Sequence, residues 1–509
     1  MAFYNLPMWL LLLLIPLLLL LKKIIKFKGQ NLPPSPPQLP IIGNLHQLGA
    51  LPHQSFTKFS KKYGPVMLFK VGRIPFVIIN SAEAAREVLK VHDIDSCSRA
   101  QLTGTRKLSY NFLDIAFAPY GDYWKQMRKI CVLELFSLKR AQSFRFIREE
   151  EVGSLINSIS QSALSSSAST PVNLSEKIYA LTGSIVFRMA FGQIFRGSGL
   201  DNHKFEKLIR ATESSIGGFT TEECIPYVGW IVDRLNGYHA KLEKTFHDLD
   251  NFFEKAIEDH RKPERAIDQD QEDIIDVMLK LEKDQTQSGE AQINKDNIKA
   301  VLMNIFLGGV DTSSITVIWA MSELARNPRL MKKAQDEVRN CIGKKGRVTE
   351  DDLDLDQLPY LKMIIKETLR LHPPAPLLVA RETISHFKVD GYDINPKTLI
   401  QVNVWAIGRE PKYWKNAEEF YPERFTDNSI DYKGQNFEFL PFGSGRRVCP
   451  GIYLGTRTSE LALANLLYCF NWKLPDGMKE EDINMEEGAG VRLNLSKKTA
   501  LNLVPLNYL

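Results

Sequence analysis

One loop around a single cysteine constrains this chain more than any other part of its sequence. In "PFGSGRRVCPG", residues 441–451, Cys449 stands among glycines, arginines and prolines, with no second cysteine or histidine beside it. Glycines allow such a loop to turn back, so that backbone N–H groups can point at a thiolate. The arginines would favour the thiolate form as well. A disulfide, a zinc ligand, a nucleophile and a buried core thiol are the roles to be separated.

The other cysteines narrow these roles. The six cysteines are scattered from Cys97 to Cys469, and no two of them form CxxC or have zinc-ligand spacing. Such sparse use favours a reducing compartment over a disulfide scaffold. Cys449 also precedes an apolar stretch that is typical of a helix, whose dipole would favour a thiolate. A lone thiolate suits a metal whose other positions are already filled, and haem iron is such a metal.

The first residues carry a targeting signal. Residues 2–21 are apolar apart from Asn5, and four lysines follow within residues 22–28. About 20 apolar residues span a bilayer, and basic residues after the run indicate a retained anchor rather than a cleaved signal peptide. The positive-inside rule then places the body in the cytosol. We expect a transmembrane signal-anchor helix over 1–22 and a basic, proline-rich hinge over 23–45.

The remaining residues, 46–509, predict one large domain that is mainly α with small β-sheets. Residues 65–80 are typical of two short strands joined around Gly72, and a second strand-rich patch covers 386–408. Helical patterns dominate elsewhere, and no later boundary resembles a domain linker. The net charge of +5 is small for 509 residues, and neither a long basic run nor zinc-finger spacing points to nucleic acid.

The cysteine loop resembles the haem-binding loop of the cytochrome P-450 monooxygenases. The family pattern Phe-x-x-Gly-x-Arg-x-Cys-x-Gly is matched at Phe442, Gly445, Arg447, Cys449 and Gly451. The resemblance implies that Cys449 is the axial ligand of the iron in haem b (iron protoporphyrin IX). It also implies that Phe442 packs beside the sulfur and that Arg447 meets a haem propionate. Together with the anchor and the hinge, the loop is most similar to plant microsomal members of the A-type group.

A helix with a Glu-x-x-Arg pair carries the second resemblance. Glu367 and Arg370 lie at positions i and i+3, a pair that by itself is weak evidence. The pair resembles the family motif that joins the arginine of "PERF", here Arg424, in a buried network behind the haem. Arg381 falls where relatives place a propionate-binding residue.

A third resemblance to the family lies in a long apolar helix that is interrupted by small and polar residues. Residues 298–324 contain Gly308, Gly309, Asp311 and Thr312, and a simple helix kink is the alternative interpretation. The stretch resembles the oxygen-binding helix of the family. The glycines would leave room for a small ligand, and Asp311 and Thr312 would be catalytic residues that organise proton delivery.

Trp124 and Arg128 lie at i and i+4 on one helix face. An amphipathic helix with a partly buried tryptophan would have the same pattern. In context the pair resembles the Trp-x-x-x-Arg helix, whose indole N–H and guanidinium bind a haem propionate. Lys125 and Lys129 lie on other faces, where they could dock an acidic electron-donor protein.

The resemblance implies a catalytic haem domain over 46–509, facing the cytosol from the endoplasmic reticulum membrane, with a single membrane pass. It would be an NADPH- and O₂-dependent monooxygenase that hydroxylates or otherwise oxidises a lipophilic plant specialised metabolite. Electrons would come from a separate NADPH–cytochrome reductase, because the chain has no flavin or dinucleotide motif. The residues expected to line the substrate pocket are Phe112, Ile115, Phe117, Ile305, Phe306, Gly308, Leu377, Leu378 and Val379.

Two other functions remain open from the sequence. The first is an isomerase or dehydratase of the same fold, acting for example on an aldoxime without net oxygen insertion. Asp311 and Thr312 count against it, since family members of that kind often lack the acid–threonine pair. The second is a non-catalytic haem sensor or binding protein, which would show no turnover.

Overall fold

The structure is a computed structural model that carries no ligand. It describes residues 30–165, 170–192, 202–225, 227–262, 272–288, 293–354, 357–489 and 493–508. The expected anchor (1–22) and the first part of the expected hinge (23–29) lie outside the described residues.

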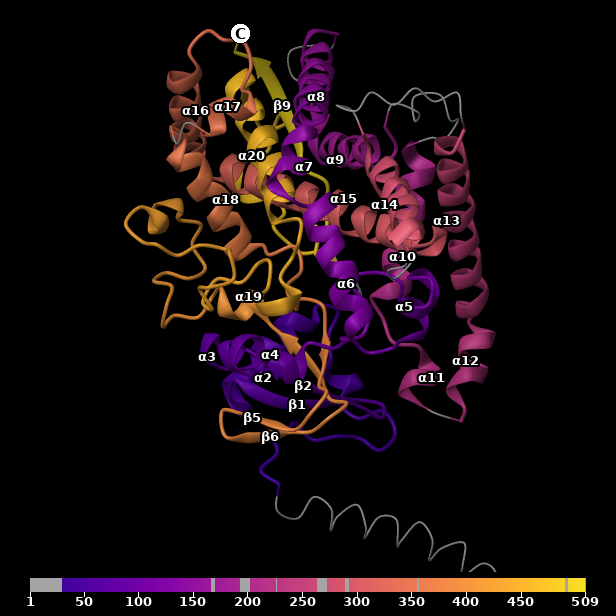
Figure 1. Cartoon of the computed structure of the whole chain (residues 1–509). Helices are drawn as coiled ribbons and strands as arrows, with labels where there is room; N and C mark the ends of the chain where they lie inside the picture. The colour runs from indigo at the N-terminus through magenta and orange to yellow at the C-terminus, as the bar shows by residue number, and fades with distance from the viewer. Residues whose placement is uncertain are drawn as a thin grey trace, which may run out of the picture.

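Helices make up most of the described chain, as the sequence predicts, and Figure 1 shows them gathered above the two sheets at the N-terminal end. The longer helices are α2 (Pro52–Tyr63), α8 (Arg145–Ser165), α9 (Leu174–Phe191), α10 (Asn202–Ile216), α13 (Tyr238–His260), α14 (Ile274–Ser288), α15 (Lys295–Arg326), α16 (Pro328–Ile342), α18 (Pro359–Leu371) and α20 (Ile452–Cys469). The shorter ones are α3 (Ala82–Arg86), α4 (Asp93–Ser96), α5 (Thr103–Leu108), α6 (Asp122–Ile130), α7 (Leu138–Ser143), α11 (Thr221–Cys224), α12 (Gly229–Leu235), α17 (Glu350–Asp354) and α19 (Val404–Ile407). Single helical turns are η1 (Leu45–Gln47), η2 (Glu87–Val91), η3 (Cys131–Leu135), η6 (Pro422–Phe425), η7 (Gly445–Arg447) and η8 (Glu480–Asp482).

Helix α15 is the centre of the core. It begins at a capping box between Asn294 and Asn297 and packs against α9, α18 and α20. Because neighbours cover it on several sides, its apolar residues are spread around the helix rather than confined to one stripe. In the part of the chain that the structure describes, α15 alone is long and apolar enough to cross a membrane, but most of it is buried inside the protein. It is therefore a core helix.

The strands form three small sheets. They are β1 (Val66–Val71), β2 (Ile74–Ile79), β3 (Val172–Asn173), β4 (Arg381–Glu382), β5 (Phe387–Val389), β6 (Tyr392–Ile394), β7 (Leu399–Val402), β8 (Phe470–Lys473) and β9 (Asn502–Asn507). The four-stranded sheet has the order β1-β2-β7-β4, in which only the β2–β7 pair is parallel. The other two sheets are β3-β9-β8 and the hairpin β5-β6.

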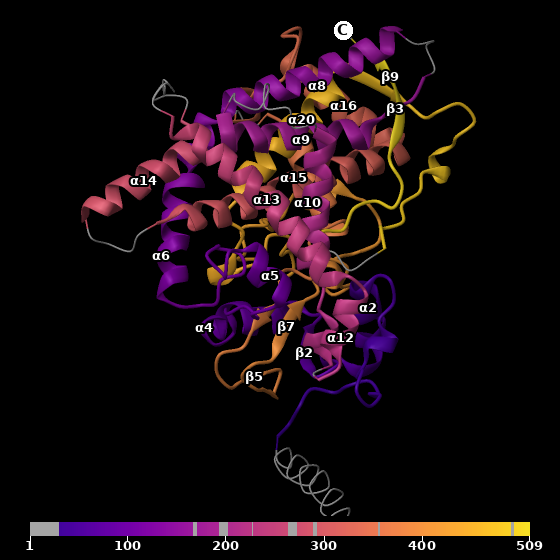
Figure 2. The ribbon, with the colours of Figure 1, turned by 90° about the vertical axis from the view of Figure 1, so that its right-hand side faces the viewer.

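The turn between β1 and β2 confirms the hairpin predicted over residues 65–80. Gly72 has φ +57°, and a Cβ at this position would lie 2.1 Å from the carbonyl oxygen of Cys224. Glycine is therefore required both for the backbone conformation and for the contact with the end of α11. Figure 2 shows α12 at the same end of the molecule as α2 and the start of the described chain.

The proline-rich segment of residues 30–45 lies against the body. The N–H of Leu68 in β1 donates to the carbonyl of Pro34 (2.9 Å), and the N–H of Asn31 donates to the carboxylate of Asp393 in β6 (2.8 Å). The segment thus contacts two different sheets.

Candidate functional site

A cavity of about 330 Å³ lies between α15 and the loop that precedes α20. Its walls come from segments far apart in the sequence, including α9, α15, residues 374–379 and the loop of Cys449. Most of the lining is apolar. The polar exceptions include the arginines and the amides described below.

Cys449 lines this cavity from the loop between η7 and α20. Its N–H donates to the carbonyl of Phe442 (3.1 Å), which closes the loop on itself. Gly445 has φ +69°, and a Cβ there would meet Leu89 O at 2.4 Å, so the backbone of η2 and the loop can touch only at glycine. Phe442 packs edge-on against Tyr432, with ring centroids 5.5 Å apart.

Burial raises the pKa of the Cys449 thiol, while the N–H of Gly451 and the charge of Arg128 act in the opposite direction. The sequence suggested that Arg446 and Arg447 would favour the thiolate. Instead Arg446 pairs with Asp93, and Arg447 points at backbone carbonyls. The protein alone thus holds this sulfur as a thiol, and a cation at the sulfur is needed to make it a thiolate.

Four arginines line the cavity near Cys449: Arg99, Arg128, Arg381 and Arg447. Arg447 donates to the carbonyls of Cys97 (2.8 Å) and Ala118 (2.7 Å). Burial, with Arg381 and Arg128 adding repulsion, lowers its pKa to about 9. Cations held this close without a carboxylate partner need a bound anion.

The other three arginines differ in their partners. Arg99, which is buried, donates to the carbonyls of Val379 (2.6 Å) and Ala380 (2.7 Å), and its pKa is lowered by burial and then by Arg447. Arg128 donates to the carbonyl of Val448, and burial lowers its pKa too. Arg381 alone has a carboxylate partner, Asp93 (2.7 Å), which it shares with Arg446.

Trp124 is buried, and its indole N–H donates to the carbonyl of Ile115 (3.0 Å). The guanidinium of Arg447 lies 4.0 Å from the centre of the indole ring. Trp124 is not part of the cavity lining among the described residues. It therefore supports Arg447 from behind in this conformation.

The face of α15 that lines the cavity carries small and polar residues. A Cβ at Gly308 would meet nothing within 4 Å, whereas a Cβ at Gly309 would lie 2.8 Å from Cγ2 of Val186 on α9. Gly308 therefore leaves space in the cavity, and Gly309 allows two helices to approach. Thr312 lines the cavity and donates to the carbonyl of Gly308 (2.6 Å). Asp311 is partly exposed and does not belong to the lining among the described residues.

The predicted network on α18 is assembled. Both guanidinium nitrogens Nε and Nη2 of Arg370 donate to the carboxylate of Glu367, at 2.7 and 2.8 Å. Nε of Arg424 donates to the same carboxylate (2.9 Å), as does the N–H of Tyr421 (2.8 Å). Glu367 and Arg370 are completely buried, so each charge is met inside the protein.

The cavity includes most of the residues expected in the substrate pocket. Those that line it are Ile115, Phe117, Ile305, Gly308, Leu378 and Val379. Phe112, Phe306 and Leu377 lie outside the lining among the described residues. Phe306 belongs to an aromatic cluster and stacks on Phe191 with centroids 5.3 Å apart. One residue after Ile305 on a helix, it faces a different side.

Sequence reasoning did not assign several polar residues of the lining to the site, among them Arg99, Asn304 and Asn494. Asn304 stands one turn before Gly308 on α15. Its Oδ1 accepts the N–H groups of Ile115 (3.0 Å) and Ala116 (3.1 Å), so it fixes the loop that forms the opposite wall. The helical spacing from Gly308 could have identified Asn304. Arg99 and Asn494 lie in the stretches 99–118 and 485–495, which the family resemblance marks as substrate-contact segments, but their side chains were not singled out.

The comparisons with known proteins agree with this geometry. The family model described as Cytochrome P450 matches residues 33–501. The chain belongs to the cytochrome P450 family.

The chain is 54% identical to Cytochrome P450 71B36 of Arabidopsis thaliana over 480 residues, 94% of each chain. It is 53% identical to Cytochrome P450 71B10 of the same plant over 500 residues, 98% of each chain. A zebrafish cytochrome P450 solved with progesterone has a TM-score of 0.75 at 24% identity and covers 89% of this chain and 99% of that one. The structural likeness shows the shared fold, and the plant relatives confirm the A-type resemblance.

Haem b is the cofactor of this haem-thiolate family of monooxygenases. The residues of this cavity fit it. A single thiol suits one axial position, and the surplus of buried guanidinium groups suits the two propionates of a porphyrin.

Proposed function

We propose that the protein is a membrane-anchored monooxygenase that oxidises a lipophilic plant metabolite with O₂ and electrons from an NADPH-dependent reductase. The observation that carries the proposal is the pairing of two unlike walls in one cavity. Cys449 and the arginines form one wall, and the small and apolar face of α15 forms the other. One wall suits an anionic, metal-containing ring, and the other suits a small gas and an apolar molecule.

In this function Cys449 would ligate the haem iron, and Arg99, Arg128, Arg381 and Arg447 would hold the propionates. Bound haem supplies the activation of O₂. The Gly451 N–H beside the sulfur moderates its electron donation, as hydrogen bonds to metal-bound sulfur generally do. Phe442 shields the sulfur from water.

Thr312 and Asp311 handle protons on the opposite wall. The hydroxyl of Thr312 donates to Gly308 O, which leaves its lone pairs available to accept from a water or a ligand in the cavity. Asp311, the preceding residue on α15, is the proposed relay toward solvent. Gly308 leaves the space that the small reactant needs.

The buried network of Glu367, Arg370 and Arg424 acts on the fold only. It ties α18 to the loop before η6 and so holds the proximal side of the cavity. Its residues do not belong to the cavity lining that the structure describes.

Exposed apolar side chains support the membrane attachment. Tyr227, Trp230 and Leu235, in and before α12, are 90%, 49% and 82% exposed. Ile41 in the proline-rich segment is 72% exposed. Both regions lie at the end of the molecule where the described chain begins (Figure 2), so they suit contact with the endoplasmic reticulum membrane beside the anchor of residues 1–22.

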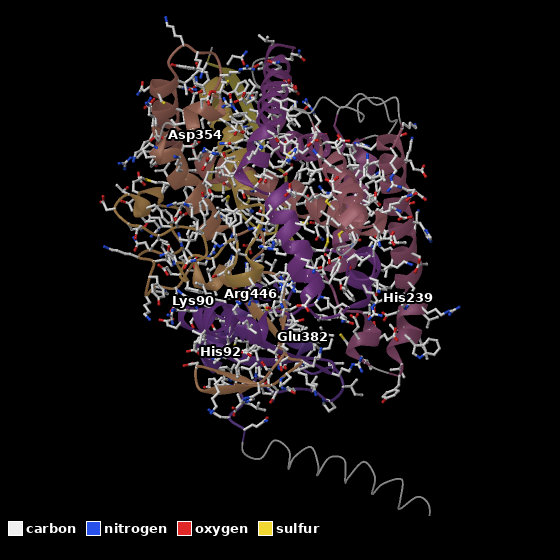
Figure 3. All side chains as sticks on the ribbon, in the orientation of Figure 1. Lys90, His92, His239, Asp354, Glu382 and Arg446 are labelled. Carbon is white, nitrogen blue, oxygen red and sulfur yellow. The ribbon has the colours of Figure 1, made fainter. Side chains whose placement is uncertain are left out.

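A basic surface supports docking of the reductase. Lys125 and Lys129 on α6 are exposed, and the side chain of Arg446, labelled in Figure 3, is 44% exposed. These cations come from the elements that carry Arg128 and Cys449, which gives an acidic electron donor a short approach to the cofactor.

Reconstitution tests the function. The full chain with a plant NADPH–cytochrome reductase should oxidise its substrate only when NADPH and O₂ are both present. Reduced protein should show a carbon monoxide band at the position typical of a thiolate haem, and Cys449→Ser should abolish that band. Turnover without NADPH, reductase and O₂ would instead establish the dehydratase or isomerase, and a band that survives the substitution would refute the ligand assignment.

A further inference from the structure

Asn494 brings a buried amide to the cavity wall from a segment near the C-terminus. It is 7% exposed and lines the cavity. The next residue, Leu495, donates its N–H to the carbonyl of Pro374 (2.8 Å), and Pro374 lines the same cavity. The amide thus lies on the wall formed by the chain after α18.

The carboxylate of Glu213 fixes the orientation of this amide. Nδ2 of Asn494 donates to Oε1 of Glu213 at 2.7 Å, and Glu213, on α10, is itself only 4% exposed. The structure thus places the NH₂ group of the amide toward Glu213, whose carboxylate oxygen accepts the hydrogen bond. The carbonyl oxygen Oδ1 is therefore turned away from Glu213.

No group in the described part of the chain donates to Oδ1 of Asn494. This oxygen is also not enclosed by packing. An amide oxygen that is open to a cavity and has no donor in the protein is available to a water or a ligand. On the wall of a ligand cavity, such an oxygen is a preformed acceptor.

Asn304, the other amide described on the cavity lining, has a structural role, and its hydrogen bonds differ from those of Asn494. Its Oδ1 accepts from Ile115 and Ala116, and its Nδ2 donates to Asp114 (2.8 Å). Both ends of that amide are used by the protein. Of these two amides on the lining, Asn494 alone keeps an end for a ligand.

We propose that Oδ1 of Asn494 binds a hydroxyl or N–H group of the substrate, and that Glu213 holds the amide in the orientation that this requires. The ligand class is an otherwise apolar molecule with one hydrogen-bond donor: an alcohol, a phenol or an indole-type amine. Because the rest of the wall is mainly apolar, this single polar contact selects the orientation in which the skeleton enters. The proposal rests on the proposed function, since it assumes that the cavity receives an apolar substrate.

Matched pairs of probes test the assignment. We suggest 4-tert-butylphenol with 4-tert-butylanisole, and indole with N-methylindole, because each pair differs only by a capped donor. Equilibrium dialysis against the full-length, haem-loaded protein measures binding without turnover. The donor member should bind about five- to tenfold more tightly, the range of one net hydrogen bond between neutral groups.

The variants identify the acceptor. Asn494→Leu, of similar volume, should reduce the preference to about onefold, mainly by weakening the donor member. Glu213→Gln should also reduce it, because a glutamine amide can pair with either end of Asn494 and so no longer fixes its direction. Leu493→Met, which alters the neighbouring wall without adding or removing a hydrogen bond, should leave the preference unchanged.

Each outcome decides the proposal. It is overturned if the wild type prefers the donor member in neither pair, or binds neither donor member. It is also overturned if Asn494→Leu and Glu213→Gln keep the wild-type ratio. If Asn494→Leu fails to fold, Glu213→Gln alone gives the answer. Loss of the carbon monoxide band or of O₂-dependent turnover would contradict the proposed function without changing the ratio of the two probe affinities. The two failures are therefore distinguishable.

Discussion

The buried arginines on α18 and those around the cavity are balanced in opposite ways. Arg370 and the nearby Arg424 share one carboxylate, Glu367, and further backbone carbonyls complete their hydrogen bonds. Arg99 and Arg447 donate only to carbonyls, and no carboxylate in the described chain pairs with them. In the first group each guanidinium has a carboxylate partner within the protein. In the second group the guanidinium groups have only carbonyl partners, which fits their proposed role of holding the carboxylates of a cofactor.

The largest expected effect is on the complete network. Glu367→Gln would leave two buried guanidinium groups without their counter-charge and should lower the free energy of unfolding by about 3–5 kcal/mol. Denaturant unfolding should show a similar loss in the haem-free and haem-loaded protein. The control Asp336→Asn removes an exposed pair with Lys332 and should change stability by less than about 0.5 kcal/mol. A loss of stability seen only in the haem-loaded protein would show that Glu367 acts through the cofactor site and would contradict the distinction between the two groups of arginines.

The next largest expected effect is a pH dependence of stability that comes from Asp114, a buried acid near the cavity arginines. Burial raises the pKa of Asp114 to about 6, against about 3.9 in an unfolded chain. The folded state therefore binds the proton more tightly, and the free energy of unfolding should fall as pH rises from about 4 to about 6. The loss is on the order of 3 kcal/mol. Asp114→Asn should lack this slope in chemical unfolding across that window, while the exposed-site control Asp122→Asn should keep it; parallel curves would contradict the assignment.

A cavity arginine should behave differently from Glu367. Arg99→Leu should speed the transfer of haem to apomyoglobin by about tenfold, equivalent to ~1.4 kcal/mol. The haem-free protein should lose less, because removing a desolvated cation offsets its lost hydrogen bonds. Arg106→Gln, at an exposed arginine nearby in the sequence, is the control. Equal losses in both forms would place Arg99 with the fold-building residues.

The smallest expected effect is a difference in stability between alanine substitutions at two neighbouring glycines, one in a helix contact and one facing the cavity. Gly309→Ala should lower stability by about 1 kcal/mol, because its methyl group meets the stiff side chain of Val186. Gly308→Ala should raise stability by up to about 1 kcal/mol through helix propensity, since its methyl group enters open space. Melting temperatures check this order, and the reverse order would show that Gly308, not Gly309, is the packing residue.

Local spacing explains which parts of the site could be predicted. The Glu367–Arg370 contact needs only one helical turn, and the cysteine loop carries its residues within eleven positions. The mainly α fold and the β1–β2 hairpin follow from periodicity and turn residues. These features depend on residues that are close in the sequence, so they could be predicted from it.

Arg99 and Phe306 show where such reasoning stops. The partners of Arg99 are carbonyls near residue 380, and no pattern around Arg99 announces them. The sequence predicts Phe306 in the pocket as an apolar residue of the stretch 303–312, but the helix turns it into the aromatic cluster with Phe191. Asn494 depends on Glu213, 281 positions away. Contacts between distant segments decide these residues.

The two contacts of the proline-rich segment have a consequence for the proposed attachment of the molecule to a membrane. Because Asn31 binds the β5–β6 hairpin and Pro34 binds β1, the start of the described chain is held at a fixed place on the body. Proline adds stiffness to this segment. In the proposed membrane-bound state this would restrict rotation of the body about its tether, so that an electron donor in the same bilayer would meet one face of the enzyme more often than free tumbling would allow.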